Sequence, residues 1–389
     1  MTAGFEPPPL VWETMGDLRA RAEAHPGGAI DLTIGTPVDP PPSFVAEVLA
    51  RSGAARSYPP SVGTPEFRRA AAGWMRRRFG VEVDPDHVAA TIGSKELVAG
   101  LPHWLRLRGD AGGRDTGGRD TGGRDTGGRD TVLHPAVAYP TYAMGARLAG
   151  CRAVAVPPRP DGGLDLDAVD PDDAARALLL WSNSPGNPTG ALDDLARAAE
   201  WGRERGIVVA SDECYAELTW DGPPRTILEA GSEGVLAVHS LSKRSNLAGL
   251  RVGFYAGDAD LVAYLGQLRK HAGFMVPGPA QEVAVAALDD DAHADAQRET
   301  YRRRIDSVVA ALRTAGLGAE PPGGAFYLWV PSPTGDGADL TARFAERAGV
   351  LVTPGATYGP HGCGHVRLAL VVPDARLPDL VARIESLAV

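Results

Sequence analysis

Lys243 is the residue best placed for covalent chemistry. It ends the run Ser240-Leu-Ser-Lys243, which follows the apolar stretch 234–238, so we expect it just beyond the carboxyl end of a strand, where open α/β sheets bind ligands. A lysine amine attacks an aldehyde once burial or a neighbouring cation has lowered its pKa. The hydroxyls of Ser240 and Ser242 and the guanidinium of Arg251 could hold a phosphate beside it. The alternative for such a short motif is a surface lysine behind helix-capping serines.

Two other segments favour the covalent interpretation. The loop Asn183-Ser-Pro-Gly-Asn187-Pro-Thr-Gly190 contains two prolines and two glycines after a predicted strand, so it should present the amide of Asn187 rigidly. The apolar run 207–210 leads into Ser211-Asp212-Glu213-Cys214-Tyr215. An aspartate paired with a pyridinium nitrogen makes that ring an electron sink, while asparagine and tyrosine can hydrogen-bond to a phenolate oxygen on it. Alone, an acidic residue at a strand end is more often a magnesium ligand or a helix cap.

These side chains need a parallel sheet to bring them together. From about residue 45 to 275, amphipathic helices alternate with short apolar runs, a pattern typical of a mostly parallel α/β sheet with helices on both faces. The run 175–181, the asparagine loop, a helix from Ala191 to the stop at Gly206, and the run 207–210 make one βαβ crossover. Because the strands end at one edge, the amine, carboxylate, amide and phenol should gather there.

The chain after residue 275 follows another pattern. We predict strands at 325–330, 350–353 and 365–372, a helix at about 340–348 and a final amphipathic helix, which together indicate a smaller α+β domain. The predicted domains are therefore a large one at 45–275 and a small one at 276–389. Residues 1–44 are predicted to be an N-terminal arm that also forms part of the small domain.

In this order the motifs resemble a known family. Asn-x-Pro-x-Asn-Pro-Thr-Gly, Asp-Glu-x-Tyr, and Ser-x-Ser-Lys with Gly-x-Arg-x-Gly look like those of the class I/II aminotransferases of the aspartate aminotransferase fold, fold type I, from Gly35 to the C-terminal helix. The resemblance implies a mostly parallel seven-stranded sheet, a pyridoxal 5′-phosphate cofactor and a homodimer with shared active sites. Lys243 would form the Schiff base with the cofactor and move the 1,3-proton.

The resemblance also implies roles for other residues. Asp212 would pair with the pyridine nitrogen, and Asn187 and Tyr215 with the ring oxygen. Tyr139 would stack on the ring, the alternative being a buried core tyrosine, and Tyr58 would reach the phosphate of the neighbouring subunit. The phosphate would be held by Ser240, Ser242, Arg251 and the loop Gly93-Ser94-Lys95, and the last of these is supported by the affinity of helix N-termini for anions.

Arg367 is predicted to bind the substrate. Val366, Leu368 and Leu370 alternate with it, so the strand should bury one face and turn Arg367 to the other. Its planar guanidinium suits bidentate binding of an α-carboxylate. The resemblance implies that the backbone near Gly35 and the side chain of Asn187 also bind the substrate. The alternative is a surface ion pair. A second substrate carboxylate would need another cation, and the candidates are Lys95, Arg56 and Lys270.

Two stretches point to a subfamily. Residues 244–254 and 269–277 resemble actinobacterial succinyldiaminopimelate aminotransferases, which implies transfer of an amino group between glutamate and N-succinyl-2-amino-6-oxopimelate by a ping-pong mechanism. Aminotransferases for aspartate, alanine or aromatic amino acids share every motif cited. A carbon–sulfur β-lyase would retain Lys243, Asp212 and Arg367, and would release pyruvate and ammonia without a keto acid. A non-catalytic binding module is the third alternative.

Composition restricts the partners. The net charge of −10 offers no basic field for nucleic acid. No stretch reaches the roughly 20 apolar residues of a membrane span, and the N-terminus lacks the pattern of a signal peptide. The three cysteines show no CxxC spacing, which argues against a disulfide framework or a metal site and favours the cytoplasm.

One insert has low complexity. The unit GGRDT occurs four times in tandem at 112–131, between a predicted helix ending near Arg108 and a strand starting at Val132. It contains no apolar residue, so we predict a mobile, solvated loop from about 110 to 131.

Overall fold

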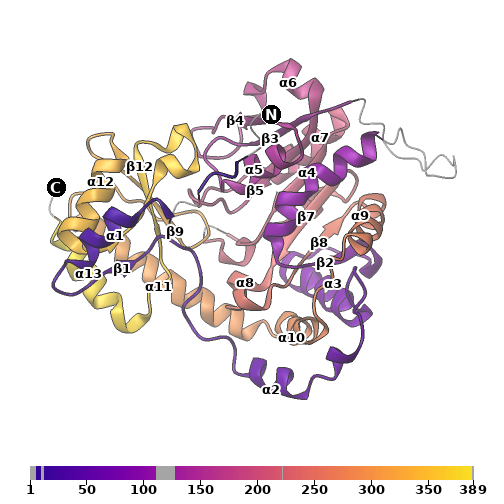
Figure 1. Cartoon of the computed structure of the whole chain (residues 1–389), viewed down its shortest axis with the longest axis horizontal. Helices are drawn as coiled ribbons and strands as arrows, with labels where there is room; N and C mark the ends of the chain where they lie inside the picture. Colours follow the sequence, from indigo (N-terminus) through magenta and orange to yellow (C-terminus); the bar gives the residue numbers. More distant parts are fainter. Residues whose placement is uncertain (1–5, 10–12, 111–127, 221, 388–389) are drawn as a thin grey trace. The chain divides into compact units, whose positions relative to one another are not determined.

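The computed structural model describes residues 6–9, 13–110, 128–220 and 222–387, which form two compact units. The large unit comprises Thr36–Thr300 and Pro322–Ala325, and the small unit comprises Met1–Gly35, Tyr301–Pro321 and Phe326–Val389. Figure 1 labels their helices and strands. The mixed α/β architecture with one large central sheet agrees with the predicted fold class.

A seven-stranded sheet is the centre of the large unit, with the order β2-β8-β7-β6-β5-β3-β4. β8 runs antiparallel to β2 and β7, and all other neighbours are parallel. The strands are β2 (Val88–Thr91), β3 (Thr131–Pro135), β4 (Arg152–Val156), β5 (Ala177–Asn183), β6 (Val208–Asp212), β7 (Val235–Ser240) and β8 (Gly253–Gly257).

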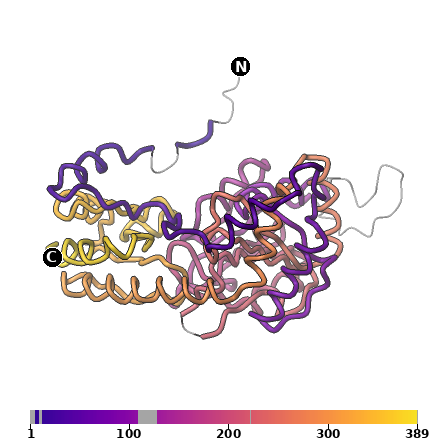
Figure 2. Tube along the Cα trace, turned by 90° about the horizontal axis from the view of Figure 1, so that it is seen from below, coloured from indigo at the N-terminus to yellow at the C-terminus, as the bar shows by residue number. Residues whose placement is uncertain are grey.

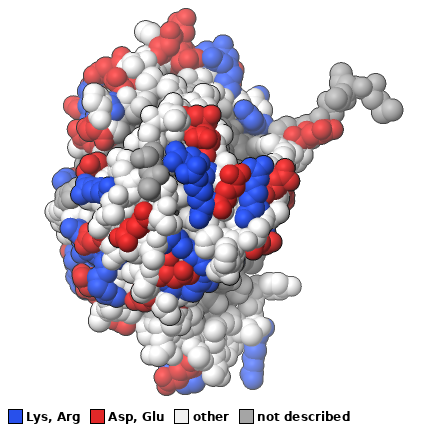
Figure 3. All heavy atoms as spheres, turned by 90° about the vertical axis from the view of Figure 1, so that its left-hand side faces the viewer, with Lys and Arg blue, Asp and Glu red and all other residues white. Residues whose placement is uncertain are grey.

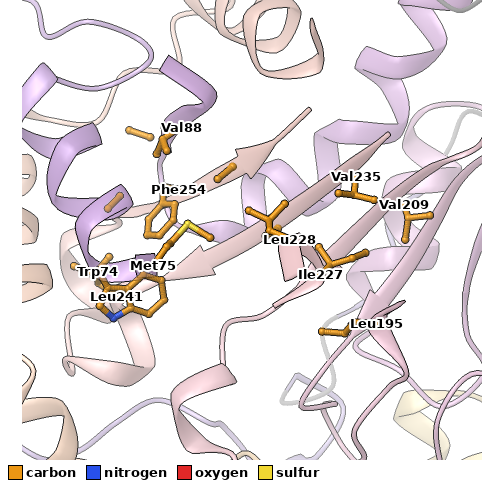
Figure 4. Close-up of a cluster of buried hydrophobic side chains, with 14 of the residues drawn as sticks. Trp74, Met75, Val88, Leu195, Val209, Ile227, Leu228, Val235, Leu241 and Phe254 are labelled. Carbon is orange, nitrogen blue, oxygen red and sulfur yellow. The ribbon is translucent and has the colours of Figure 1, made fainter. Parts of the chain in front are cut away.

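Helices cover both faces of this sheet. Val235 and Ala237 of β7 belong to a core cluster with helices α3, α7 and α10, part of which Figure 4 shows. Leu236 and Val238 belong to the opposite cluster, with α4, α5 and α9, as the period of two along a strand requires. The helices are α2 (Phe44–Arg51), α3 (Pro65–Phe79), α4 (Ser94–Asp110), α5 (Thr141–Leu148), α6 (Pro171–Arg176), α7 (Leu195–Arg205), α8 (Leu241–Arg244), α9 (Ala259–His271), α10 (Gly278–Asp289) and the first part of α11 (Ala292–Thr314).

Local signals explain where helices begin and end. The hydroxyl of Thr64 accepts a hydrogen bond from the backbone N–H of Phe67, Pro65 occupies the first position of α3, and Gly80 ends the helix with φ 72°. The crossover helix α7 begins at Leu195, four residues later than the predicted Ala191, because Asp194 caps it by accepting from the N–H of Arg197 at 3.0 Å. It ends at Gly206 as predicted.

The boundaries of the units differ from the predicted boundaries at residues 44 and 275. Residues 276–300 lie in the large unit because α10 packs on α2 and α3. Residues 36–44 lie there too, and two hydrogen bonds hold them: Nδ2 of Asn246 donates to the carbonyl of Pro40 at 3.3 Å, and Nε2 of Gln297 donates to Oδ2 of Asp39 at 2.8 Å.

The small unit contains an antiparallel sheet in the order β11-β12-β9 and a parallel pair, β1 with β10. The N-terminal segment belongs to it, because Ala22 packs against Ala345 and Leu351, and Figure 2 shows this segment beside the C-terminal part of the chain. The elements are α1 (Gly16–Glu23), β1 (Ile30–Asp31), the end of α11, β9 (Tyr327–Pro331), α12 (Gly337–Arg343), β10 (Val350–Leu351), β11 (Thr353–Pro354), β12 (His365–Ala369) and α13 (Leu377–Glu385).

The predicted GGRDT loop is only partly described. Residues 111–127 lie outside the described residues. The described part of the last copy, residues 128–131, makes defined contacts, contrary to the prediction of a solvated loop up to residue 131. Arg129 donates to the carbonyls of Arg205, Gly206 and Ala177 at 2.8, 3.0 and 3.1 Å. Asp130 pairs with Arg176, and Thr131 is fully buried as the first residue of β3. The last carbonyl groups of a helix have no N–H partner within the helix, and the guanidinium of Arg129 donates hydrogen bonds to those at the end of α7.

Charged side chains of both signs are interspersed on the face shown in Figure 3. In the part of the chain that the structure describes, no helix combines the length and apolarity needed to cross a membrane. Within the same residues, no group of three histidine, cysteine, aspartate or glutamate side chains is arranged to hold a metal ion.

Candidate active site

Three parallel strands of the large unit end together at the predicted edge. β5 ends at Asn183, which pairs in register with Asp212 at the end of β6, and Asp212 pairs with Val238 near the end of β7. The short helix α8, which carries Lys243, follows β7 directly. The sheet therefore brings the asparagine loop, the carboxylate and the lysine to one edge.

Asp212 is a buried carboxylate with several donors. Its side chain is 7% exposed, its Oδ2 accepts from the hydroxyl of Tyr142 at 2.9 Å, and its Oδ1 accepts from the N–H of Cys214 at 3.3 Å. Burial raises the pKa of Asp212, while hydrogen bonds from Cys214 and Tyr142 and the charge of Lys243 lower it. Burial therefore favours the neutral acid, whereas the hydrogen bonds from Cys214 and Tyr142 and the charge of Lys243 favour the ionised carboxylate.

Tyr142 is a site residue that the sequence reasoning missed. It is fully buried on α5, and burial together with the charge of Asp212 raises its pKa well above the ordinary value, so it stays a donor. Its ring lies edge-on to that of Tyr139, with 6.2 Å between centroids. Tyr139 lies just before α5 and Tyr142 in its first turn, and the sequence carried no signal for the contact with Asp212, 70 positions away.

Lys243 is half-buried on an anchored helix. The hydroxyl of Ser240 caps α8 by accepting from the N–H of Ser242 at 3.2 Å, and both serines are buried. The next residue, Arg244, is buried, pairs with Glu217 and donates to the carbonyl of Ala287 at 2.7 Å. These contacts fix the helix turn from which the lysine side chain extends.

The loop Gly93-Ser94-Lys95 and Arg251 also lie together. Arg251 donates to the carbonyl of Ile92 at 3.3 Å, and a Cβ atom on Gly93 would lie 2.3 Å from its Nη2. Gly93 has φ 66°, which a side chain would disfavour, and Ser94 is the first residue of α4. A glycine is thus needed where the guanidinium approaches the backbone, and the helix N-terminus beside it suits an anion.

Ser94, Lys95 and Tyr139 are linked to this edge. The thiol of Cys214 donates to the hydroxyl of Ser94 at 3.1 Å, which joins the loop to the end of β6. Nζ of Lys95, an exposed side chain, lies 5.8 Å from the ring centroid of the half-buried Tyr139. The tyrosine is half-buried and packs against the core cluster on this face of the sheet.

The asparagine loop is fixed by Asn183. Its Oδ1 accepts from the N–H of Asn187 at 2.8 Å, and its Nδ2 donates to the carbonyl of Asp212 at 2.9 Å. Asn187 and Tyr215 are 8% and 7% exposed. Tyr58 differs from all of these, because its side chain is 95% exposed in the single chain.

The small unit places Arg367 and Gly35 in one cluster. Arg367 donates to the carbonyl of Thr33, and its guanidinium carbon lies 4.4 Å and 5.0 Å from the ring centroids of Tyr327 and Tyr358. A Cβ atom on Gly35 would lie 2.1 Å from the hydroxyl of Tyr327, so only glycine fits there. The prediction that β12 buries one face alone was wrong: Arg367 is 5% exposed, because aromatic side chains cover its face as well.

The other predicted cations are at the surface. Arg56 and Lys270 are exposed, as is Lys95. Taken together, the large unit presents an amine, a carboxylate with its donors, an amide and a glycine loop at a helix N-terminus. Such a set can hold an aromatic aldehyde that carries a phosphate and can move protons beside it.

Comparisons with known proteins agree with this chemistry. The family model described as "Aminotransferase class I and II" matches residues 28–384. The chain is 42% identical over 386 residues to a probable aminotransferase of Mycobacterium tuberculosis, covering 97% of this chain and 85% of that protein. It is 41% identical to the 4-dedimethylamino-4-oxo-anhydrotetracycline transaminase of Streptomyces rimosus, covering 97% and 99%. A solved structure of a probable N-succinyldiaminopimelate aminotransferase from Thermus thermophilus matches with a TM-score of 0.83 at 32% identity, covering 97% and 100%.

Proposed function

We propose a role for Lys243 from the fact that this chain belongs to the class I and II aminotransferases. Lys243 holds the family's pyridoxal 5′-phosphate covalently and carries the proton during amino transfer. The residues present fit this cofactor. The buried Asp212 with its donor Tyr142 suits a protonated pyridine nitrogen, and the close approach of Arg251 to Gly93 leaves a cradle suited to a phosphate. When bound, the cofactor supplies the electron sink for the α-carbon.

We assign the remaining roles to the chain's own residues. Asn187 and Tyr215 would donate to the ring oxygen, and the rigid loop set by Asn183 would hold the amide in place. Ser94, Ser240, Ser242 and Arg251 would bind the phosphate, with Lys95 beside it, and Tyr139 would cover the ring. Arg367 would bind the α-carboxylate with the backbone at Gly35, since two aromatic rings hold its guanidinium in one orientation.

For the substrate we propose N-succinyl-2-amino-6-oxopimelate, with glutamate as the donor, in diaminopimelate synthesis in the cytoplasm. The resemblance of residues 244–254 and 269–277 to this subfamily supports the proposal. So does the likeness to the structure of the probable N-succinyldiaminopimelate aminotransferase from Thermus thermophilus. A second substrate carboxylate would then need one of the exposed cations, Lys95, Arg56 or Lys270. The chain is also 41% identical to a 4-dedimethylamino-4-oxo-anhydrotetracycline transaminase, so the identity of the acceptor is the decisive question.

An acceptor panel tests the substrate. The purified enzyme would be assayed with glutamate and N-succinyl-2-amino-6-oxopimelate, its unsuccinylated analogue, and the keto acids of aspartate, alanine and aromatic amino acids, by following 2-oxoglutarate. We expect the succinylated acceptor to give the highest kcat/KM. A higher value for any other acceptor would refute this assignment, and release of pyruvate and ammonia without an acceptor would indicate a β-lyase.

The lysine is tested separately. We expect Lys243→Ala to lose transamination with every acceptor and to lose the pH-dependent visible absorption of the bound cofactor, while its far-ultraviolet circular dichroism stays unchanged. Arg225→Ala, which removes one positive charge from a side chain that is 65% exposed, is the matched control for charge. Normal turnover of Lys243→Ala would refute the proposed mechanism.

We also propose a homodimer whose sites are shared through Tyr58. Tyr58 is 95% exposed in the isolated subunit. We propose that a partner subunit covers its apolar ring in the dimer. Sedimentation should give a dimer, and Tyr58→Ala should weaken cofactor binding. A monomeric active enzyme would exclude the shared site.

A further inference from the structure

Glu213 and His239 form a buried pair next to the candidate cofactor site. Glu213 follows Asp212 in the chain, and His239 precedes Ser240 on β7. Oε2 of Glu213 lies 3.3 Å from Nε2 of His239, and the two side chains are 0% and 3% exposed. Neither of these atoms has a hydrogen-bond partner among the described residues. A buried polar pair of this kind requires either a shared proton or a water molecule to satisfy it.

The surroundings disfavour charge on the histidine. Its ring centroid lies 5.0 Å from that of Trp74, 5.7 Å from Phe79 and 5.0 Å from Phe254. Burial in this aromatic cage lowers the pKa of His239 to about 3, so the imidazole is neutral in the folded protein.

The surroundings also favour the proton on the glutamate. Oε1 of Glu213 accepts from the N–H of Ile227 at 2.8 Å. Burial raises the pKa of Glu213 to about 8, although the hydrogen bonds from Ile227, Thr226 and Ser211 oppose this change, and the charge of Asp212 raises it further. The carboxyl group therefore keeps its proton at neutral pH.

A small cavity adjoins the pair. About 10 Å³ of it is open to the centre of a water molecule, and its lining includes Glu213, His239, Trp74 and Arg244. Nε1 of Trp74 and Nη2 of Arg244, like the two facing atoms of the pair, lack hydrogen-bond partners among the described residues. A water needs roughly 10–15 Å³ of such space and two to four polar partners, so the cavity fits one water.

The other ionisable groups near the pair do not place a free cation beside it. Arg244 is engaged with Glu217, which also pairs with Arg78 at 2.8 Å. The titratable and charged groups on the elements around Glu213 are Asp212, Cys214 and Tyr215 of its own segment, His239 of β7, Glu217 of η5 (Ala216–Leu218), Arg244 of α8 and Arg78 of α3.

We propose that Glu213 is a protonated positioning residue: its carboxylic acid, the neutral imidazole of His239 and one internal water form a network that keeps the rear of the cofactor site uncharged. The inference rests on the proposed function. Ionised Glu213 would put a second negative charge next to Asp212 and strengthen proton binding by the groups around the cofactor. A unit charge at roughly 10 Å, with an effective dielectric constant of about 20, moves a pKa by about one unit.

Infrared spectroscopy of the full-length protein tests the proton itself. The carbonyl stretch of a protonated carboxylic acid should be present at neutral pH and disappear as the pH passes about 8. Glu213→Gln should lack this band. Glu229→Gln should retain it, because Glu229 lies outside the buried pair and contacts Arg225 at the surface. The wild-type difference spectrum between low and high pH needs no variant, so a variant that fails to fold leaves the test intact. A wild-type protein without the band would overturn the proposal.

The spectral titration of the bound cofactor tests the link to the site. In the wild type, ionisation of Glu213 should contribute an alkaline step. Glu213→Gln should lose that step of about one pH unit and keep the neutral-pH spectrum, because its amide is uncharged like the protonated acid, while Glu229→Gln should titrate as the wild type does. A purely structural role would change stability but not the alkaline titration of the cofactor, so an alkaline step that persists in Glu213→Gln would refute the positioning role.

The two proposals fail in different ways. The infrared band does not require bound cofactor, so it reports Glu213 even in a protein that does not bind it. If Lys243→Ala kept normal turnover, the proposed function would fail while the band could remain. If the band were absent but Lys243→Ala were inactive, only the inference about Glu213 would fail.

Discussion

Replacing Arg269 by methionine should destabilise the protein and weaken cofactor binding, because Arg269 holds the loop Gly93-Ser94-Lys95 in place through Glu96. Nη1 and Nη2 of Arg269 donate to Glu96 at 2.8 and 2.6 Å, and Oε1 of Glu96 also accepts from the N–H of Ile92, just before the loop Gly93-Ser94-Lys95. Arg269 is 1% exposed, and the ring centroids of Trp104 and Phe274 each lie 5.3 Å from its guanidinium carbon. The pair thus connects α9 to the first turn of α4.

The expected cost follows from the burial of this pair. Removing one partner of a buried ion pair leaves the other charge desolvated, which costs on the order of 3–5 kcal/mol. Methionine fills part of the aromatic cage and keeps the apolar contacts. The decrease in the free energy of unfolding therefore comes mainly from removing the positive charge of Arg269. The double variant Arg269→Met with Glu96→Gln should recover part of it, because no uncompensated carboxylate remains.

Urea unfolding measures these changes. The free energy of unfolding would be compared for the wild type, the two single variants and the double variant, with cofactor affinity measured alongside. Arg225→Met removes an ion pair of similar length whose arginine is 65% exposed, and it should cost less than about 1 kcal/mol. If Arg269→Met were no more destabilising than Arg225→Met and bound the cofactor normally, the proposed role of the Arg269–Glu96 pair in holding the loop would be refuted.

Three further predictions follow from single contacts. Tyr142→Phe removes the donor to Asp212, and kcat/KM should fall roughly tenfold to a hundredfold; unchanged steady-state kinetics would contradict the link. Deleting residues 112–126 leaves one copy of GGRDT to make the contacts of Arg129, so the thermal midpoint should stay within about 2 °C, whereas Arg129→Ala should cost about 1–3 kcal/mol; equal losses would disprove the distinction. For Glu213 the folded pKa is about 8 against an ordinary 4.5, so between these values the unfolded chain has released a proton that the folded chain retains, and rising pH favours unfolding. Relative to Glu213→Gln, the wild type should therefore lose on the order of 4 kcal/mol between about pH 5 and pH 8; parallel stability curves would refute this.

Much of the candidate site could be predicted because each motif sits at a strand end. The apolar runs before Asn183, Asp212 and Ser240 have the length and composition of buried strands, and a parallel sheet leaves their carboxyl ends at one edge. The type of each element and its place in the sheet depend on such short-range patterns, which is why these predictions could be made from the sequence.

The missed features depend on partners far away in the chain. Tyr142 and Asp212 are 70 positions apart, and Arg269 and Glu96 are 173 apart. No periodicity links such residues, because only the packing of α5 and α9 on the sheet brings them together. Arg129 was missed for the opposite reason: its neighbours look like a low-complexity repeat, and the carbonyls that it satisfies belong to α7 and β5.

Two adjacent carboxyl groups at the end of β6 illustrate how the fold sets charge. Asp212 meets the hydroxyl of Tyr142, the N–H of Cys214 and the field of Lys243, so donors and a cation oppose the cost of burial. Glu213 meets backbone and hydroxyl donors, but its near neighbour His239 is neutral and Arg244 is engaged by Glu217. Burial is common to both carboxyl groups, whereas the charge of Lys243 lowers the pKa of Asp212 and the charge of Asp212 raises the pKa of Glu213. The side of the sheet that each faces, set by a shift of one residue along the chain, therefore separates a carboxylate suited to a pyridinium from an acid that retains its proton.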